Sequence, residues 1–194
     1  MNWLSTVFIS MFASNALLTW GFGLRQGFKP GTRHSPSWLG ALLALNSIAS
    51  VMLWFLSSLV LRPLGMSHLV TIAYALFVIP VLRLLSRGAF MLLGLPNDTR
   101  SFELDELTIS TLVFGISLIT LRGSSNLAES LLAAFASVLG WWSAIEVLGA
   151  INRRTEEGPI PPRMKGAPVI FLSAALVAMI VSFASLALTQ GFNK

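Results

Sequence analysis

The stretch APVIFLSAALVAMIVSFASLAL, residues 167–188, contains no charged side chain. It is long enough to cross a lipid bilayer as one helix, because about 20 apolar residues span the hydrocarbon core. Similar apolar runs precede it, each bounded by Gly, Pro or charged residues. The sequence therefore predicts an all-α integral membrane protein, residues 1–194 in one domain, with six transmembrane helices. We expect them at about residues 3–24, 37–61, 68–93, 107–121, 127–151 and 167–190.

The composition supports lipid as the solvent of most side chains. The chain is 55% hydrophobic and 11% charged, with a mean hydropathy of +0.77, so a soluble domain would lack the polar surface to cover its core. Cysteine is absent, which excludes disulfides, thiolate zinc sites and cysteine nucleophiles built by this chain alone. The net charge of +5 comes from basic residues spread over many connections. We therefore expect the lipid bilayer, and no nucleic acid, as a partner.

The basic residues also predict the orientation of the chain. Nine of the 13 Lys and Arg residues lie in or beside the connections at about 25–36, 95–106 and 152–166. The opposite side of the membrane receives only Arg62, Arg122 and Lys194. The positive-inside rule then places the three basic connections in the cytoplasm and both termini outside.

The six spans divide into two halves of three, repeat 1 at about 3–93 and repeat 2 at about 107–190. An odd number of spans in each half gives the halves opposite orientations, so we expect two inverted three-helix repeats. Phe22-Gly23-Leu24 in the first span of one half is echoed by Phe114-Gly115-Ile116 in the first span of the other. Folds of this kind place functional sites where the repeats meet.

Short motifs lie at the ends of the first, second and fifth spans and in the last connection. They are Asn15 with Phe22-Gly23-Leu24, Leu61-Arg62-Pro63-Leu64-Gly65, Ala150-Ile151-Asn152-Arg153-Arg154 and Ile160-Pro161-Pro162-Arg163-Met164-Lys165-Gly166. In order and spacing the chain resembles the RnfA/NqrE family, six-span subunits of the ion-translocating Rnf and Nqr redox complexes of bacterial membranes. The resemblance implies a membrane-embedded subunit of an electron-transport-driven Na⁺ or H⁺ translocating complex in the bacterial inner (cytoplasmic) membrane, with periplasmic termini. The implied partners are a homologous six-span sister subunit together with other membrane redox subunits.

The family's iron–sulfur cluster is held by one cysteine directly after the end of span one and another in span four, together with equivalent cysteines of the sister subunit. The resemblance places these positions at Arg25 and Thr111, and neither side chain supplies a thiolate. We therefore expect no cofactor and no metal bound by this chain, and at most a non-catalytic role in the complex. Arg25 either anchors the helix to anionic headgroups or replaces the positive charge of the metal centre.

Polar side chains within the spans are candidates for an ion path. Ser14 and Asn15 lie in the first span of repeat 1, and Ser110 and Thr111 lie in the first span of repeat 2. Inverted repeats can bring such oxygen atoms together near the midplane, where they would coordinate a desolvated cation. Hydrogen bonding between helices is the alternative role.

Glu146 lies inside the fifth span, about two turns before its cytoplasmic end. An ionised carboxylate at this depth is costly without a partner. We expect either an ion or proton relay, or a structural ion pair with Arg153 or Arg83, or a side chain that reaches toward the interface.

Two other functions fit the same pattern. An inverted-repeat transporter acting alone would be stable without other subunits, whereas a purely structural or assembly subunit would be found with them. The presence of a sister six-span protein in the same particle distinguishes these alternatives.

Overall fold

A computed structural model describes residues 3–23, 36–85, 110–123, 126–158, 161 and 165–192. Within these ranges the regular elements are all helical, which confirms the predicted all-α membrane fold. They are α1 (Trp3–Phe8), η1 (Ile9–Ala13), α3 (Pro36–Leu56), η2 (Ser57–Leu61), η3 (Ser67–Leu69), α4 (Val70–Ala73), η4 (Tyr74–Val78), α7 (Thr111–Gly123), α8 (Leu127–Glu157) and α9 (Ala167–Phe192).

Four helical stretches of the described residues are long and apolar enough to cross a membrane. They are Leu39–Leu61, Ser67–Leu85, Leu127–Thr155 and Ala167–Leu186. These four agree with the second, third, fifth and sixth predicted spans. The fourth predicted span, 107–121, corresponds to the shorter apolar helix α7, and residues 107–109 lie outside the described residues. The first predicted span differs, because α1 with η1 ends at Ala13.

The first span is not one helix over residues 3–24. The helix ends at Ala13, and residues 14–23 form turns. The Asn15 side-chain oxygen accepts hydrogen bonds from the backbone N–H groups of Leu17 (3.0 Å) and Leu18 (3.2 Å), which replaces the helical pairing of these groups. Gly21 and Gly23 then have φ of 70° and 77°, a backbone conformation that glycine adopts without steric cost. Apolar composition alone therefore overestimates the length of this helix.

The turn between the second and third spans has the geometry that its sequence predicts. The N–H of Met66 donates to the carbonyl of Leu61 (2.9 Å), and that of Gly65 donates to Arg62 (3.1 Å). This is the Schellman arrangement, in which Gly65, with φ of 69°, occupies the left-handed position.

The third span contains a π-helical turn just before its proline. Pro80 has no N–H to donate to the carbonyl one turn earlier. The turn just before it, η4, is a π-helix, and regular α-helix resumes over residues 79–85. The wider turn accommodates the proline while the helix continues.

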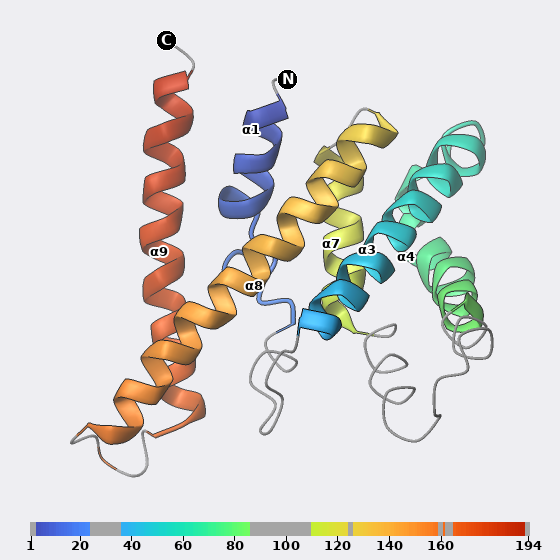
Figure 1. The fold of residues 1–194 in the computed structure, drawn as a ribbon. Coiled ribbons are helices and arrows are strands. Elements are labelled where there is room, and N and C mark those ends of the chain that lie inside the picture. The colour runs from blue at the N-terminus through green and yellow to red at the C-terminus, as the bar shows by residue number, and fades with distance from the viewer. Residues whose placement is uncertain are drawn as a thin grey trace.

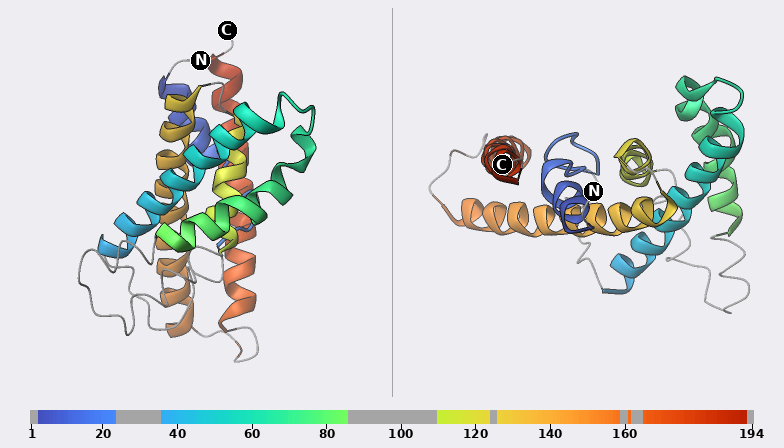
Figure 2. Two further views of the ribbon diagram at one scale, coloured as in Figure 1. Left: turned by 90° about the vertical axis from the view of Figure 1, so that its right-hand side faces the viewer. Right: turned by 90° about the horizontal axis from the view of Figure 1, so that it is seen from above.

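The long helix α8 organises the bundle. The view from above in Figure 2 shows α9, α1 and α7 on the same side of α8, while α3 crosses near the N-terminal half of α8. In Figure 1 the start of α1 and the end of α9 lie at one end of the bundle, and the end of α8 and the start of α9 lie at the other. Arg153 and Arg154, in the last turns of α8, therefore lie at the end of the bundle opposite the beginning of α1.

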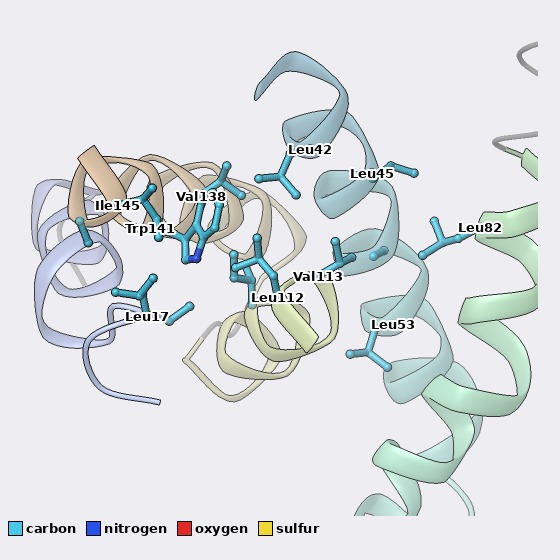
Figure 3. Packing of buried hydrophobic residues seen from close by; sticks show 14 of the residues in the cluster. Leu17, Leu42, Leu45, Leu53, Leu82, Leu112, Val113, Val138, Trp141 and Ile145 are labelled. Carbon is cyan, nitrogen blue, oxygen red and sulfur yellow. The ribbon is translucent and has the colours of Figure 1, made fainter. Parts of the chain in front are cut away.

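The apolar core lies between α8, α7 and α3. Trp141 of α8 is fully buried, and Figure 3 shows it with Val138 beside Leu112 of α7 and Leu42 of α3. On the adjacent side of α8, Gly140 lies directly against the backbone of Met11 in η1. The small residues Ala133 and Ser137 are buried on α8 as well, and the Ser137 hydroxyl donates to the Ser10 carbonyl (3.4 Å). Small side chains thus let two helix backbones come close together, as is common in membranes.

Candidate functional site

The predicted polar pair of the first span lies where the helix ends. Asn15 is buried, and its amide nitrogen donates to the Met11 carbonyl (3.0 Å) while its side-chain oxygen accepts the two backbone N–H groups that follow. Both lone pairs of that oxygen are therefore engaged. Ser14 is half-buried, and its backbone N–H donates to the Ile9 carbonyl (2.7 Å). Asn15 therefore stabilises the turn that follows the end of the first helix.

The predicted polar pair of the fourth span lies at the start of α7. Ser110 is buried, and its hydroxyl oxygen accepts the backbone N–H of Val113 (3.4 Å), the position of a helix N-cap. Thr111 is exposed. The two hydroxyl groups thus lie in different environments although they are adjacent in sequence.

The end of the first span and the start of α7 are in contact. A Cβ atom built on Gly23 would lie 2.6 Å from Nε1 of Trp141 and 3.0 Å from Cδ1 of Leu112, and the ring of Phe22 lies directly against Gly115. The two Phe-Gly echoes of the sequence therefore meet in space.

This contact also bears on the family's cluster. Arg25 comes two residues after Gly23 and lies outside the described residues, and Thr111 is next to Leu112. The chain contains no cysteine, and a guanidinium has no lone pair available for iron. The residues at these two positions do not fit an iron–sulfur cluster of the family's kind.

Glu146 is exposed on the surface of α8 and is not buried within its own bundle. Among the described residues, none forms a hydrogen bond or ion pair with its carboxylate, so the expected pairing with Arg153 or Arg83 is not formed in this structure. The reason is the facing of α8. Glu146 is exposed together with Val147 and with Ala150, one turn later, whereas Ile145 and Leu148 face the core.

The sequence predictions did not single out a second group of polar residues, which is buried between α3 and α7. Asn46 and Ser50 are one turn apart on α3, and Ser117 and Thr120 are one turn apart on α7. All four are at most 2% exposed. The hydroxyl groups of Ser50 and Thr120 lie 3.4 Å apart and join the two helices. The spacing of four and three residues within apolar runs is the signal that would have identified these residues.

One oxygen atom of this buried polar group, Oδ1 of Asn46, lacks a hydrogen-bond partner among the described residues. The hydroxyl of Tyr74 faces Ser117, and the Tyr74 ring packs edge-on against Phe114 at 5.0 Å between centroids. The Asn46 amide nitrogen, by contrast, donates to the Ala134 carbonyl (3.5 Å). The hydroxyl groups of Ser117 and Thr120 donate to backbone carbonyls of α7 at 2.8 and 3.0 Å, and a hydroxyl oxygen that donates can also accept. We call Asn46, Ser50, Tyr74, Ser117 and Thr120 the α3–α7 polar cluster.

A buried acceptor without a donor is costly, because it loses its hydrogen bonds to water and gains none in return. A water molecule or a cation satisfies such oxygen atoms. The Oδ1 atom of Asn46 is therefore the group in the α3–α7 polar cluster that such a ligand would satisfy.

Comparison with known proteins gives a consistent set of relatives, although no family model matches the chain. The RnfA subunit of the ion-translocating oxidoreductase complex of Cereibacter sphaeroides is 30% identical over 142 residues, 69% of this chain and 70% of the relative. The protein of the same name from Buchnera aphidicola is 26% identical over 76% of this chain and 78% of the relative. The corresponding subunit of the Na⁺-translocating ferredoxin:NAD⁺ oxidoreductase complex of Acetobacterium woodii is 25% identical over 72% of each chain.

Proposed function

Because this chain belongs to the RnfA/NqrE family of ion-translocating oxidoreductase complexes, we propose that it is a membrane-embedded subunit of such a complex and contributes part of the path of the translocated ion. The four long apolar helices support a multi-pass position in the membrane. The names of the relatives support a multi-subunit assembly driven by electron transfer. A homologous six-span sister subunit together with other membrane redox subunits are the proposed partners. The bacterial inner membrane, with both termini periplasmic, is the proposed location.

The proposed ion path runs through the α3–α7 polar cluster. The unpartnered Oδ1 atom of Asn46 is the observation that carries this proposal, because a buried amide oxygen without a donor is a ligand for a desolvated cation or for an ordered water. Ser50, one turn after Asn46 on α3, lies 3.4 Å from the Thr120 hydroxyl of α7 and adds two further oxygen atoms to the proposed path. Ser14, Asn15, Ser110 and Thr111 fit this role less well, since the oxygen of Asn15 is fully engaged and Thr111 is exposed.

The same proposal assigns no iron–sulfur cluster to this chain. Electron transfer then belongs to the other subunits of the complex, and this chain couples to it through the ion path. The family's cysteine positions are occupied by residues that offer no soft anionic ligand for iron.

The test is the ratio of ions moved to electrons transferred by the reconstituted complex. Asn46→Leu replaces the amide by an apolar side chain of similar size. We expect complexes that still assemble to transfer electrons while ion uptake into vesicles falls toward background. Uptake measured separately with Na⁺ and with a proton-sensitive dye identifies the ion.

Ser47→Ala is the matched control. Ser47 is the next residue on α3, and its hydroxyl donates to the Leu43 carbonyl of the same helix (2.7 Å). We expect this variant to keep the wild-type ratio. An unchanged ratio in fully assembled Asn46→Leu complexes would show that the cluster is not on the ion path.

A further inference from the structure

The carboxylate of Glu146 is exposed on a helix whose surroundings are lipid or another protein. Glu146 lies inside the candidate span Leu127–Thr155 of α8, and seven residues, about 10 Å of helix rise, separate it from Arg153, the first basic residue that follows. A glutamate side chain is shorter than lysine or arginine and reaches the interface less easily. A charge facing hydrocarbon at this position is unfavourable. Something other than lipid tails must therefore cover it.

The surface around Glu146 has the shape and chemistry of a helix-packing face. Phe135, Leu139, Val147 and Ala150 are exposed on α8, at spacings that place them along one side of the helix with Glu146. A Cβ atom built on Gly149, one turn after Glu146, would have no atom within 4 Å.

The remaining elements leave this surface open. Its residues are all exposed, so none of the described elements buries this surface. We call the five residues Phe135, Leu139, Glu146, Val147 and Ala150 the outer face of α8.

We propose that the outer face of α8 binds a transmembrane helix of another subunit of the complex, and that this helix carries an Arg or Lys side chain that pairs with Glu146. The inference rests on the proposed function, because it names the partner surface of that complex. Charge complementarity selects this occupant, since a cation on the partner offsets the desolvation of the carboxylate. A second copy of this chain packed symmetrically through the same face would bring two Glu146 carboxylates together, which is unfavourable.

The experiment uses the complex purified through a tag on this chain, with each co-purifying subunit quantified relative to it. We expect Glu146→Lys to reduce the bound partner by about tenfold or more, because it places like charges in a desolvated interface. Glu146→Gln, which keeps the shape of the side chain, should cause a smaller loss. Glu157→Lys is the control, since Glu157 is exposed at the end of α8, beyond the apolar stretch, and it should retain the partner.

A photo-crosslinking residue at Val147 then identifies the partner helix and its basic residue. Changing that basic residue to Glu should restore binding to Glu146→Lys. Full retention of the partner by Glu146→Lys overturns the proposal, as do crosslinks from Val147 only to lipid or to a second copy of this chain. If the wild-type chain co-purifies with no other subunit, the proposed function itself fails. If the wild-type complex is intact and Glu146→Lys leaves it unchanged, only the proposed binding surface fails.

Discussion

The close approach of α8 to the first helix makes Gly140 the most informative position for a stability test. A Cβ atom at Gly140 would lie 2.9 Å from Cα and 3.0 Å from the carbonyl carbon of Met11, and it would also meet the Met11 carbonyl oxygen. These atoms are backbone, so no side-chain rotation relieves the contact. Gly140→Ala therefore requires a movement of the first helix away from α8.

The size of that movement follows from the distances. Ordinary contact begins at 3.4 Å, so the Cα atom of Met11 must retreat by about 0.5 Å, and the Met11 carbonyl oxygen, the nearest atom, must move further. The Met11 carbonyl accepts the Asn15 amide and lies next to the Ser10 carbonyl, which accepts the Ser137 hydroxyl, so both hydrogen bonds are strained. Overpacking of this kind costs about 1–3 kcal/mol. The gain in helix propensity from Gly to Ala, about 1 kcal/mol, offsets part of that cost.

Gly149→Ala provides the matched control on the same helix. The same propensity gain applies there, but the added Cβ meets no atom within 4 Å. The difference between the two variants therefore reports the clash alone, about 1–3 kcal/mol. With roughly 2–4 °C per kcal/mol for a chain of this size, Gly140→Ala should melt about 2–12 °C below Gly149→Ala. The assay is thermal unfolding of the purified variants in one detergent, and equal melting temperatures would refute the close approach of the two helices.

The remaining predictions test other contacts of the fold and site. Gly115→Ala should destabilise the protein because its methyl group meets the ring of Phe22, and Phe22→Leu in the same chain should restore most of the melting temperature, since a side chain, unlike a backbone, can be made smaller. Asn15→Ala should cost about 2–3 kcal/mol, because two backbone N–H groups and the Met11 carbonyl lose their partner near the core; Thr19→Ala, at an exposed position, should change the melting temperature little. Cysteines introduced at Met66 and Glu157 should react with an impermeant thiol reagent from opposite faces of the membrane, with no background because the chain has no cysteine, and labelling of both from one face would contradict the topology. Assays for iron and acid-labile sulfide on the purified chain should give no stoichiometric cluster, and a cluster spectrum that depends on Thr111 would show that the cluster positions are assigned incorrectly.

The second, third, fifth and sixth spans could be predicted closely from the sequence. Long apolar runs between polar connections have few stable structures in a bilayer, because every backbone group must be hydrogen-bonded within the segment. The turn at residues 61–66 was predictable for a local reason, since the proline and the left-handed Gly65 are both encoded in four residues. The early end of the first helix was not predictable from hydropathy. It depends on the hydrogen bonds of the Asn15 side chain with the neighbouring backbone, which a hydropathy average does not include.

Some residues of the candidate site could likewise be identified from the sequence, and others only from the structure. The sequence identified Asn15 and Ser110 as polar residues within apolar runs, but the structure shows them bound to neighbouring backbone groups. The sequence did not single out Asn46, whose unpartnered oxygen became visible only when α3 and α7 were placed together. An unpartnered atom is a property of its surroundings and not of the residue.

The sequence by itself determined that this protein lies in a membrane, approximately where the second, third, fifth and sixth spans lie, and to which family it belongs. Only the tertiary structure decided which side of each helix faces the bundle. In water the apolar side of a helix marks the core, but in lipid the outside is as apolar as the inside, so hydrophobic periodicity carries little information about facing. Glu146 and Ile145 are neighbours in one apolar stretch, yet Ile145 is buried and Glu146 is exposed. Gly140 touches another backbone while Gly149, on the same helix, touches nothing, because only the packing of α8 against α1 and η1 distinguishes the two positions.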